Sequence, residues 1–186
     1  MRLFARFPRI LIIATFFAPC AYGKEQHRAH VHGEAKLNIA VEGKTAEVEF
    51  EAPAMSIYGF EHEPKNPAQT KARDLAVELL KKDAAKMFAF EEGLSCKIET
   101  KKVEPLAKDE HSSTHKKKGG KSTKPDEHGE LHAQFSVKCE KNLSGSTVKF
   151  GVWTLFPQVT EVHVQIIGDK SQGGGEVSKK KDSLKL

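Results

Sequence analysis

The chain has 186 residues, of which 38% are hydrophobic and 30% are charged, and its formal net charge is +5. Three of its arginines and none of its acidic residues lie in residues 1–23, so removal of that segment lowers the net charge by three, to +2. The remaining charge does not argue for nucleic-acid binding, because nucleic-acid-binding proteins have a concentrated basic face, and the remaining length suits a single domain.

Residues 1–23 have the pattern of a secretion signal. Three arginines precede an apolar run, residues 10–18, that is too short to span a bilayer, and Ala21, Tyr22 and Gly23 form a small-x-small cleavage site. We expect cleavage after Gly23, which leaves a secreted chain without a membrane segment. A retained anchor is the alternative, and a lipoprotein attached through Cys20 is disfavoured by the proline before it.

Cys96 and Cys139 are the cysteines that remain after the signal is removed. An even pair in an oxidising compartment is typical of a disulfide. A disulfide between these two cysteines would stabilise the fold by about 4 kcal/mol in the chain-entropy model, because it closes a loop in the unfolded chain. The alternative is that both thiolates bind a metal, although no C-x-x-C spacing supports it.

The clearest structural pattern is a β-hairpin. Residues 35–41 alternate between apolar and polar side chains, and residues 45–51 do the same. The turn between them, residues 42–44, contains Gly43. Two half-buried strands joined by a short glycine-containing turn predict an antiparallel pair.

A long helix is predicted from about residue 67 to residue 91. Asn66 is the expected N-cap, Pro67 takes the first helical position, and Gln69 follows three residues after the cap. Gly93 is the expected stop. The predicted apolar stripe consists of Ala72, Leu75, Ala76, Leu79, Leu80, Met87 and Phe88.

The second half of the chain predicts further strands around a polar insertion. Residues 94–103 and 130–140 each carry one cysteine, so the disulfide is expected at the neck of the segment between them. That segment, residues 104–129, has too little apolar content to offset its ordering entropy, and we expect it to be disordered without a ligand.

A helical turn at residues 152–156 and a strand at residues 159–167 are expected next, followed by a flexible polar tail over residues 169–186. The predicted domain, residues 24–168, is therefore an α+β fold in which one long helix packs on an antiparallel sheet.

Nine histidines, eight of them in or beside irregular segments, are the unusual feature of the composition. Histidine-rich tracts in secreted chains commonly bind metals. If residues 30–32 are extended, His30 and His32 point to one face. We expect a zinc site at one end of the sheet. Its candidate ligands are His27, His30, His32, Glu61, His62, His111, His115, His128 and His132.

Each histidine group also has a purely structural interpretation. Residues 27–33 also fit an exposed polar leader, and Glu61 with His62 also fits a local feature of the helix entry. His111 and His115 have chelating spacing but would bind weakly in a disordered segment. His163 stands on the polar side of a strand and is interpreted as a surface histidine. No nucleophile with a paired base and no catalytic motif is present, so binding without catalysis is predicted.

Two segments resemble the ZrgA-type periplasmic zinc-binding family: residues 30–43 (HVHGEAKLNIAVEG) and residues 53–62 (PAMSIYGFEH), the second with a distinctive G-F-E-H end. Residues 155–157 (LFP) and the strand at residues 162–167 are also similar. The resemblance implies the periplasm of a Gram-negative bacterium and a role in high-affinity zinc uptake. The resemblance also implies that His30, His32, His62, His128 and His132 are metal ligands. The lysine-rich insertion departs from the family's histidine-rich loop.

We therefore expect a periplasmic protein that captures Zn²⁺ and supports its delivery to a zinc uptake transporter. Two alternatives remain at this point. Imidazole also suits copper and nickel. In the second alternative, the protein is an interaction module whose lysine-rich insertion binds an acidic partner, and the histidines have no role in function.

Overall fold

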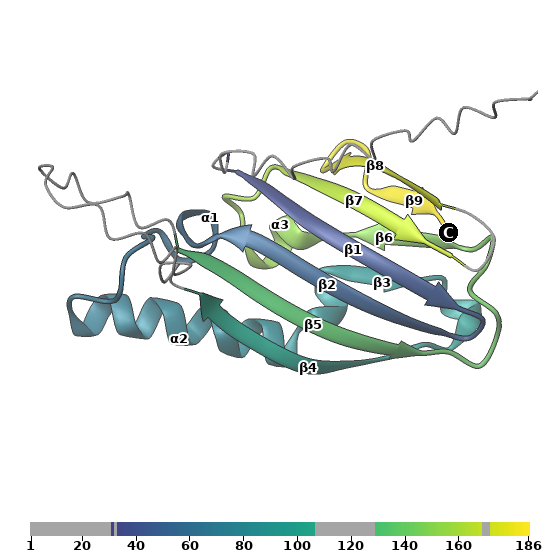
Figure 1. The fold of residues 1–186 in the computed structure, drawn as a ribbon, viewed down its shortest axis with the longest axis horizontal. Coiled ribbons are helices and arrows are strands. Elements are labelled where there is room, and N and C mark those ends of the chain that lie inside the picture. The colour runs from purple at the N-terminus through teal and green to yellow at the C-terminus, as the bar shows by residue number, and fades with distance from the viewer. Residues whose placement is uncertain (1–30, 32, 107–128, 169–171) are drawn as a thin grey trace, which may run out of the picture.

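A computed structural model describes residues 31, 33–106, 129–168 and 172–186 (Figure 1). The predicted signal segment and His27, His30, His32, His111, His115 and His128 lie outside these residues.

The strands form two sheets. The large sheet contains β1 (Glu34–Glu42), β2 (Thr45–Pro53), β4 (Lys97–Leu106), β5 (Glu130–Lys138), β7 (Glu161–Ile167) and β8 (Gln172–Ser178). The small sheet contains β3 (Phe88–Phe90), β6 (Thr147–Phe150) and β9 (Ser183–Lys185). The strand orders are β4-β5-β2-β1-β7-β8 and β3-β6-β9.

The predicted hairpin is confirmed as β1 and β2. The two strands pair antiparallel up to Glu42 and Thr45, and Gly43 takes a left-handed φ of 56° in the turn between them. Leu37 and Val48 are fully buried, whereas the alternate side chains face outward. The period of two in the sequence therefore sorts these strands into one core face and one polar face.

The large sheet is mixed rather than purely antiparallel as predicted. β1 and β7 run parallel, from the pair Glu34 and Glu161 to the pair Ala40 and Ile167, whereas the other neighbours in this sheet are antiparallel. The chain passes through β6 and α3 (Val152–Leu155) before it enters β7, and these elements lie behind the large sheet in Figure 1. The chain therefore enters β7 at the same end of the sheet at which β1 begins.

The core lies between the large sheet and a second layer made of the small sheet and the helices (Figure 1). Its largest fully buried side chains include Phe50, Phe88, Phe135, Phe150 and Leu37. The rings of Phe88 and Phe135 meet edge to face with centroids 5.4 Å apart, which joins the two layers. The other face of the large sheet carries the polar residues of the strands.

The predicted helix forms but is shorter than expected. α2 (Pro67–Lys82) begins as predicted, with the Asn66 side chain accepting a hydrogen bond from the Gln69 amide at 3.0 Å. It ends at Lys82, because the chain then makes a 3₁₀ turn, and Phe88 pairs with Phe150 between β3 and β6. Leu75, assigned to the buried stripe, is 59% exposed. A second helix, α1 (Ala54–Tyr58), follows β2. No helix in the described part of the chain has the length and apolar content needed to cross a membrane.

The disulfide between Cys96 and Cys139 is confirmed, with an S–S distance of 2.03 Å. Its predicted place is wrong. The cysteines flank the pair Lys97 and Lys138, whereas residues 107–128 leave from the opposite end of the same two strands, beside the pair Leu106 and Glu130. Residues 104–106, assigned to the disordered insertion, belong to β4.

The predicted flexible tail contains two strands. β8 pairs antiparallel with β7, and β9 pairs with β6. Val177 of β8 is 1% exposed, so this strand contributes to the core. This strand was not predicted from the sequence, because residues 173–175 are glycines and glycine has a low strand propensity.

Candidate metal centre

The outer face of the large sheet carries a row of charged and imidazole side chains. Register partners follow one another across the six strands. In strand order they are Glu104, His132, Glu51, Lys36, His163 and Glu176. Partners on neighbouring strands project to the same face, so two histidines stand among carboxylates there.

Three side chains of this face converge at the β1–β7 junction. Nε2 of His163 lies 3.2 Å from a carboxylate oxygen of Glu34 and 3.5 Å from one of Glu161. Among the residues that the structure describes, this is the one group of three or more metal-ligating side chains whose ligand atoms all lie within 4.8 Å of one another. The three side chains are 34–40% exposed, so solvent reaches the group.

Gly33 fixes the two strands at the start of this group. Its carbonyl oxygen accepts hydrogen bonds from the amides of Thr160 at 2.8 Å and Glu161 at 3.2 Å, and its own amide donates to Oγ of Ser56 at 2.9 Å. Its φ of 90° lies in the region that glycine adopts without strain. The backbone therefore holds Glu34 and Glu161 side by side before any metal binds.

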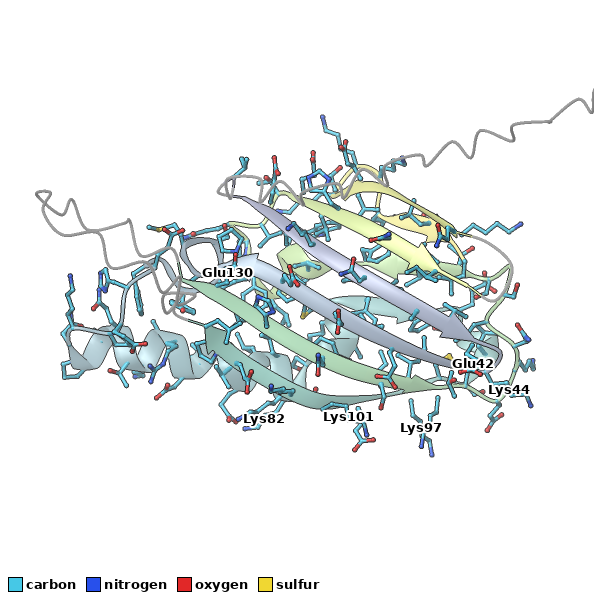
Figure 2. The ribbon with its side chains drawn as sticks, in the orientation of Figure 1. Glu42, Lys44, Lys82, Lys97, Lys101 and Glu130 are labelled. Atoms are coloured by element: carbon cyan, nitrogen blue, oxygen red, sulfur yellow. A yellow bond between two sulfur atoms is a disulfide. The ribbon has the colours of Figure 1, made fainter. Side chains whose placement is uncertain are left out.

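The group borders an open hollow of about 700 Å³ on the polar face. Glu51, Glu130 and Glu176 line this hollow together with Lys36, its single lysine. Glu130 is labelled in Figure 2 beside the end of β2, whereas Lys82, Lys97 and Lys101 lie along the α2–β4 edge. Carboxylates thus outnumber cations in the hollow, and their field favours a dication.

His132 lies in the same row, two strands from Lys36. Its Nε2 is 3.1 Å from Glu130 and its Nδ1 is 3.9 Å from Glu51. The hydrogen bond to Glu130 raises the pKa of His132, and partial burial opposes this rise. Since the two carboxylates face different ring nitrogens, they do not surround one ligand atom as Glu34 and Glu161 do.

A comparison with known protein families identifies the chain. The family described as ZrgA family zinc uptake protein matches residues 29–186. The chain belongs to the ZrgA family. The resemblance seen in the sequence is thereby confirmed, and the match includes Glu34, Glu161 and His163 as well as β8 and β9. No curated protein matches the chain.

Two of the ligands predicted from the sequence, Glu61 and His62, lie between α1 and α2, and of these only His62 is also implied by the ZrgA resemblance. Nδ1 of His62 is 2.8 Å from the carbonyl oxygen of Glu63, and its ring stacks on Phe60 with centroids 5.4 Å apart. The carbonyl oxygen of Glu61 accepts a hydrogen bond from the amide of Gly129 at 3.0 Å. The described residues do not unite these two and His132 in one ligand group, and their metal binding stays a prediction.

Glu34, Glu161 and His163 were not predicted as a group from the sequence, where His163 was interpreted as a surface histidine. Glu161 and His163 share one face of β7 at a spacing of two, which is a local signal. The partner Glu34 belongs to β1, and only the parallel pairing of β1 with β7 brings it to them. A carboxylate spaced two residues from a histidine at the start of a strand would have been the signal to follow.

Proposed function

We propose that this ZrgA-family protein captures Zn²⁺ on the outer face of its large sheet, at Glu34, Glu161 and His163, and binds it without catalysis. The observation that carries the proposal is the convergence of two carboxylates on one imidazole nitrogen. Membership of a zinc uptake family supports zinc as the ion. We further propose that the protein supports delivery of zinc to a high-affinity uptake transporter.

The distances in the group suit zinc. Zinc bonds to nitrogen and carboxylate oxygen measure about 2.0–2.2 Å, so two ligand atoms of a tetrahedral ion are about 3.4 Å apart. Nε2 of His163 is 3.2 Å from the Glu34 oxygen and 3.5 Å from the Glu161 oxygen. An ion can therefore enter between these atoms with little movement of the strands.

The exposure of the group favours capture and release. Three protein ligands leave one position of a tetrahedral ion open, whereas structural zinc sites use four protein ligands. His163 is 34% exposed and the adjoining hollow is open, so an incoming ligand can reach the metal. These properties support a transient carrier better than a permanent structural site.

Further ligands are proposed from the histidines named in the sequence. His32 stands two residues before Glu34, and a two-residue chain reaches at most about 7 Å. We propose His32, with His30 and His27 before it, as the first candidates for the open position. His62, His111, His115, His128, His132 and Glu61 remain proposed contributors.

A periplasmic location is proposed on two grounds. The Cys96–Cys139 disulfide suits an oxidising compartment. Residues 1–23 have the pattern of a cleaved signal.

Calorimetric titration of the purified protein with Zn²⁺ at about pH 7.5 tests the proposal, because imidazole is mostly neutral there. We expect near-stoichiometric binding and a loss of affinity of at least about tenfold in His163→Ala. Glu47→Ala is the matched control, since Glu47 is an exposed carboxylate on β2, several residues along the same face. Absence of zinc binding, or equal affinity of His163→Ala and the wild type, would refute the proposal.

A further inference from the structure

The strand β8 brings a third carboxylate to His163, from the side opposite to β1. Glu176 is the register partner of His163 across the β7–β8 pair, and its Oε1 lies 3.7 Å from Nδ1 of the imidazole. Glu34 and Glu161 face the other nitrogen, Nε2. The imidazole thus has two carboxylates at one nitrogen and a single carboxylate at the other.

We propose that Glu176 is a positioning residue, which accepts a hydrogen bond from Nδ1–H of His163 and so directs Nε2 to a metal ion held with Glu34 and Glu161. This inference rests on the proposed function, because it concerns the same metal ion. A neutral imidazole binds metal through the nitrogen that lacks the proton, and the partner of the other nitrogen selects the tautomer and the ring orientation.

The surroundings of His163 single out Glu176 for this role. On the β1 side, the register partner of His163 is Lys36, whose ammonium is a donor only. On the β8 side, it is Glu176, which is an acceptor when ionised. A shortening of the 3.7 Å separation by about 0.5 Å completes a hydrogen bond, and Glu176, at 67% exposure, has room to make that movement.

Two substitutions of Glu176 separate orientation from charge. Glu176→Ala removes both the negative charge and the acceptor, whereas Glu176→Gln removes the charge and keeps an amide oxygen that accepts from Nδ1–H. We expect calorimetric titration with Zn²⁺ to show a loss of about tenfold in affinity for Glu176→Ala. Glu176→Gln is expected to stay within about threefold of the wild type, and the control Glu47→Ala to match the wild type.

Equal losses for Glu176→Ala and Glu176→Gln would overturn the inference, because they would show that only the charge matters. Wild-type affinity in Glu176→Ala would overturn it as well. Failure of the site itself is recognised separately, because His163→Ala would then also bind zinc like the wild type. That result would remove the proposed function together with this inference.

Nitrogen NMR of the imidazole provides a second readout that a merely structural role would not change. In the zinc-loaded wild type and in Glu176→Gln, we expect His163 to show one species with the metal on Nε2 and the proton on Nδ1. In Glu176→Ala, a second species with the metal on Nδ1 is expected. Coordination through Nδ1 in the wild type would overturn the inference.

Discussion

Glu34 and Glu161 are register partners at the first positions of two parallel strands, so that two residues far apart in the chain present their carboxylates side by side. Both carboxylates approach Nε2 of the same imidazole, that of His163. The group is therefore a product of the β1–β7 pairing. Any change that disturbs this pairing is expected to affect metal binding, even where it touches none of the three side chains.

Glu34→Gln tests the contribution of a single ligand. The amide keeps the size of the side chain but is a weaker ligand without charge, so we expect zinc affinity to fall by about tenfold or more. The free energy of unfolding without metal is expected to stay the same or rise slightly, since like charges in the group repel one another. Calorimetry and urea unfolding in a chelator measure the two effects. A large loss of stability would contradict the assignment of Glu34 as a ligand.

Gly33→Ala tests how the backbone supports the site. Gly33 has a φ of 90°, and an added Cβ would lie 3.1 Å from Oγ1 of Thr160. We expect the free energy of unfolding to fall by about 1–2 kcal/mol, together with a weaker zinc affinity. Gly93→Ala is the control, because a Cβ at Gly93 meets no atom within 4 Å and its φ is not positive. Equal effects of the two substitutions would argue against this role of Gly33.

The His132–Glu130 hydrogen bond predicts a pH dependence of stability. It raises the pKa of His132 in the folded state, so its stabilisation is fully present below the unfolded pKa of about 6.5 and is lost as the pH rises through the folded value. Because His132 is partly exposed, the effect is expected to be small, about 0.5–1 kcal/mol. Chelator-treated wild type should thus be more stable than His132→Gln at about pH 6, with the difference shrinking by about pH 9. A difference that grows with pH would contradict this.

Removal of the disulfide is expected to destabilise the fold without weakening the metal centre. The bond closes a loop between residues 43 positions apart, and the chain-entropy model assigns it about 4 kcal/mol as an upper value. It lies at the end of β4 and β5 that is remote from Glu130 and the hollow. Paired Cys96→Ala and Cys139→Ala substitutions should therefore lower the melting temperature and leave zinc affinity unchanged. A lower zinc affinity in this double variant would indicate that the two cysteines contribute to zinc binding.

Features that depend on local sequence were predicted from the residues. The alternation around Leu37 and Val48 determines the hairpin, and Asn66 caps α2 because its side chain accepts from a nearby amide. The helix end was missed, since Met87 and Phe88 continue the helical spacing of apolar residues. Instead, Met87 follows a 3₁₀ turn and Phe88 begins β3, and both side chains are buried in the core. Tertiary packing therefore overrides the local helical pattern.

The contacts of the candidate metal centre depend on strand pairing between distant segments, and they were not predicted. Nothing near His163 in the sequence indicates that Glu34 will lie beside it, because that contact requires β7 to run parallel to β1. Glu176 was assigned to a flexible tail, since the glycines before it do not favour a strand. The candidate metal centre thus combines residues of β1, β7 and β8, whereas near these strands ligands were predicted only from the histidines that precede β1.

The central claim is that zinc binds between Glu34, Glu161 and His163. Anomalous scattering at the zinc edge from zinc-soaked crystals tests it most directly. We expect an anomalous peak about 2.0–2.2 Å from Nε2 of His163 and from an oxygen of each carboxylate. Peaks found only elsewhere on the protein, with His163 free of metal, would contradict it.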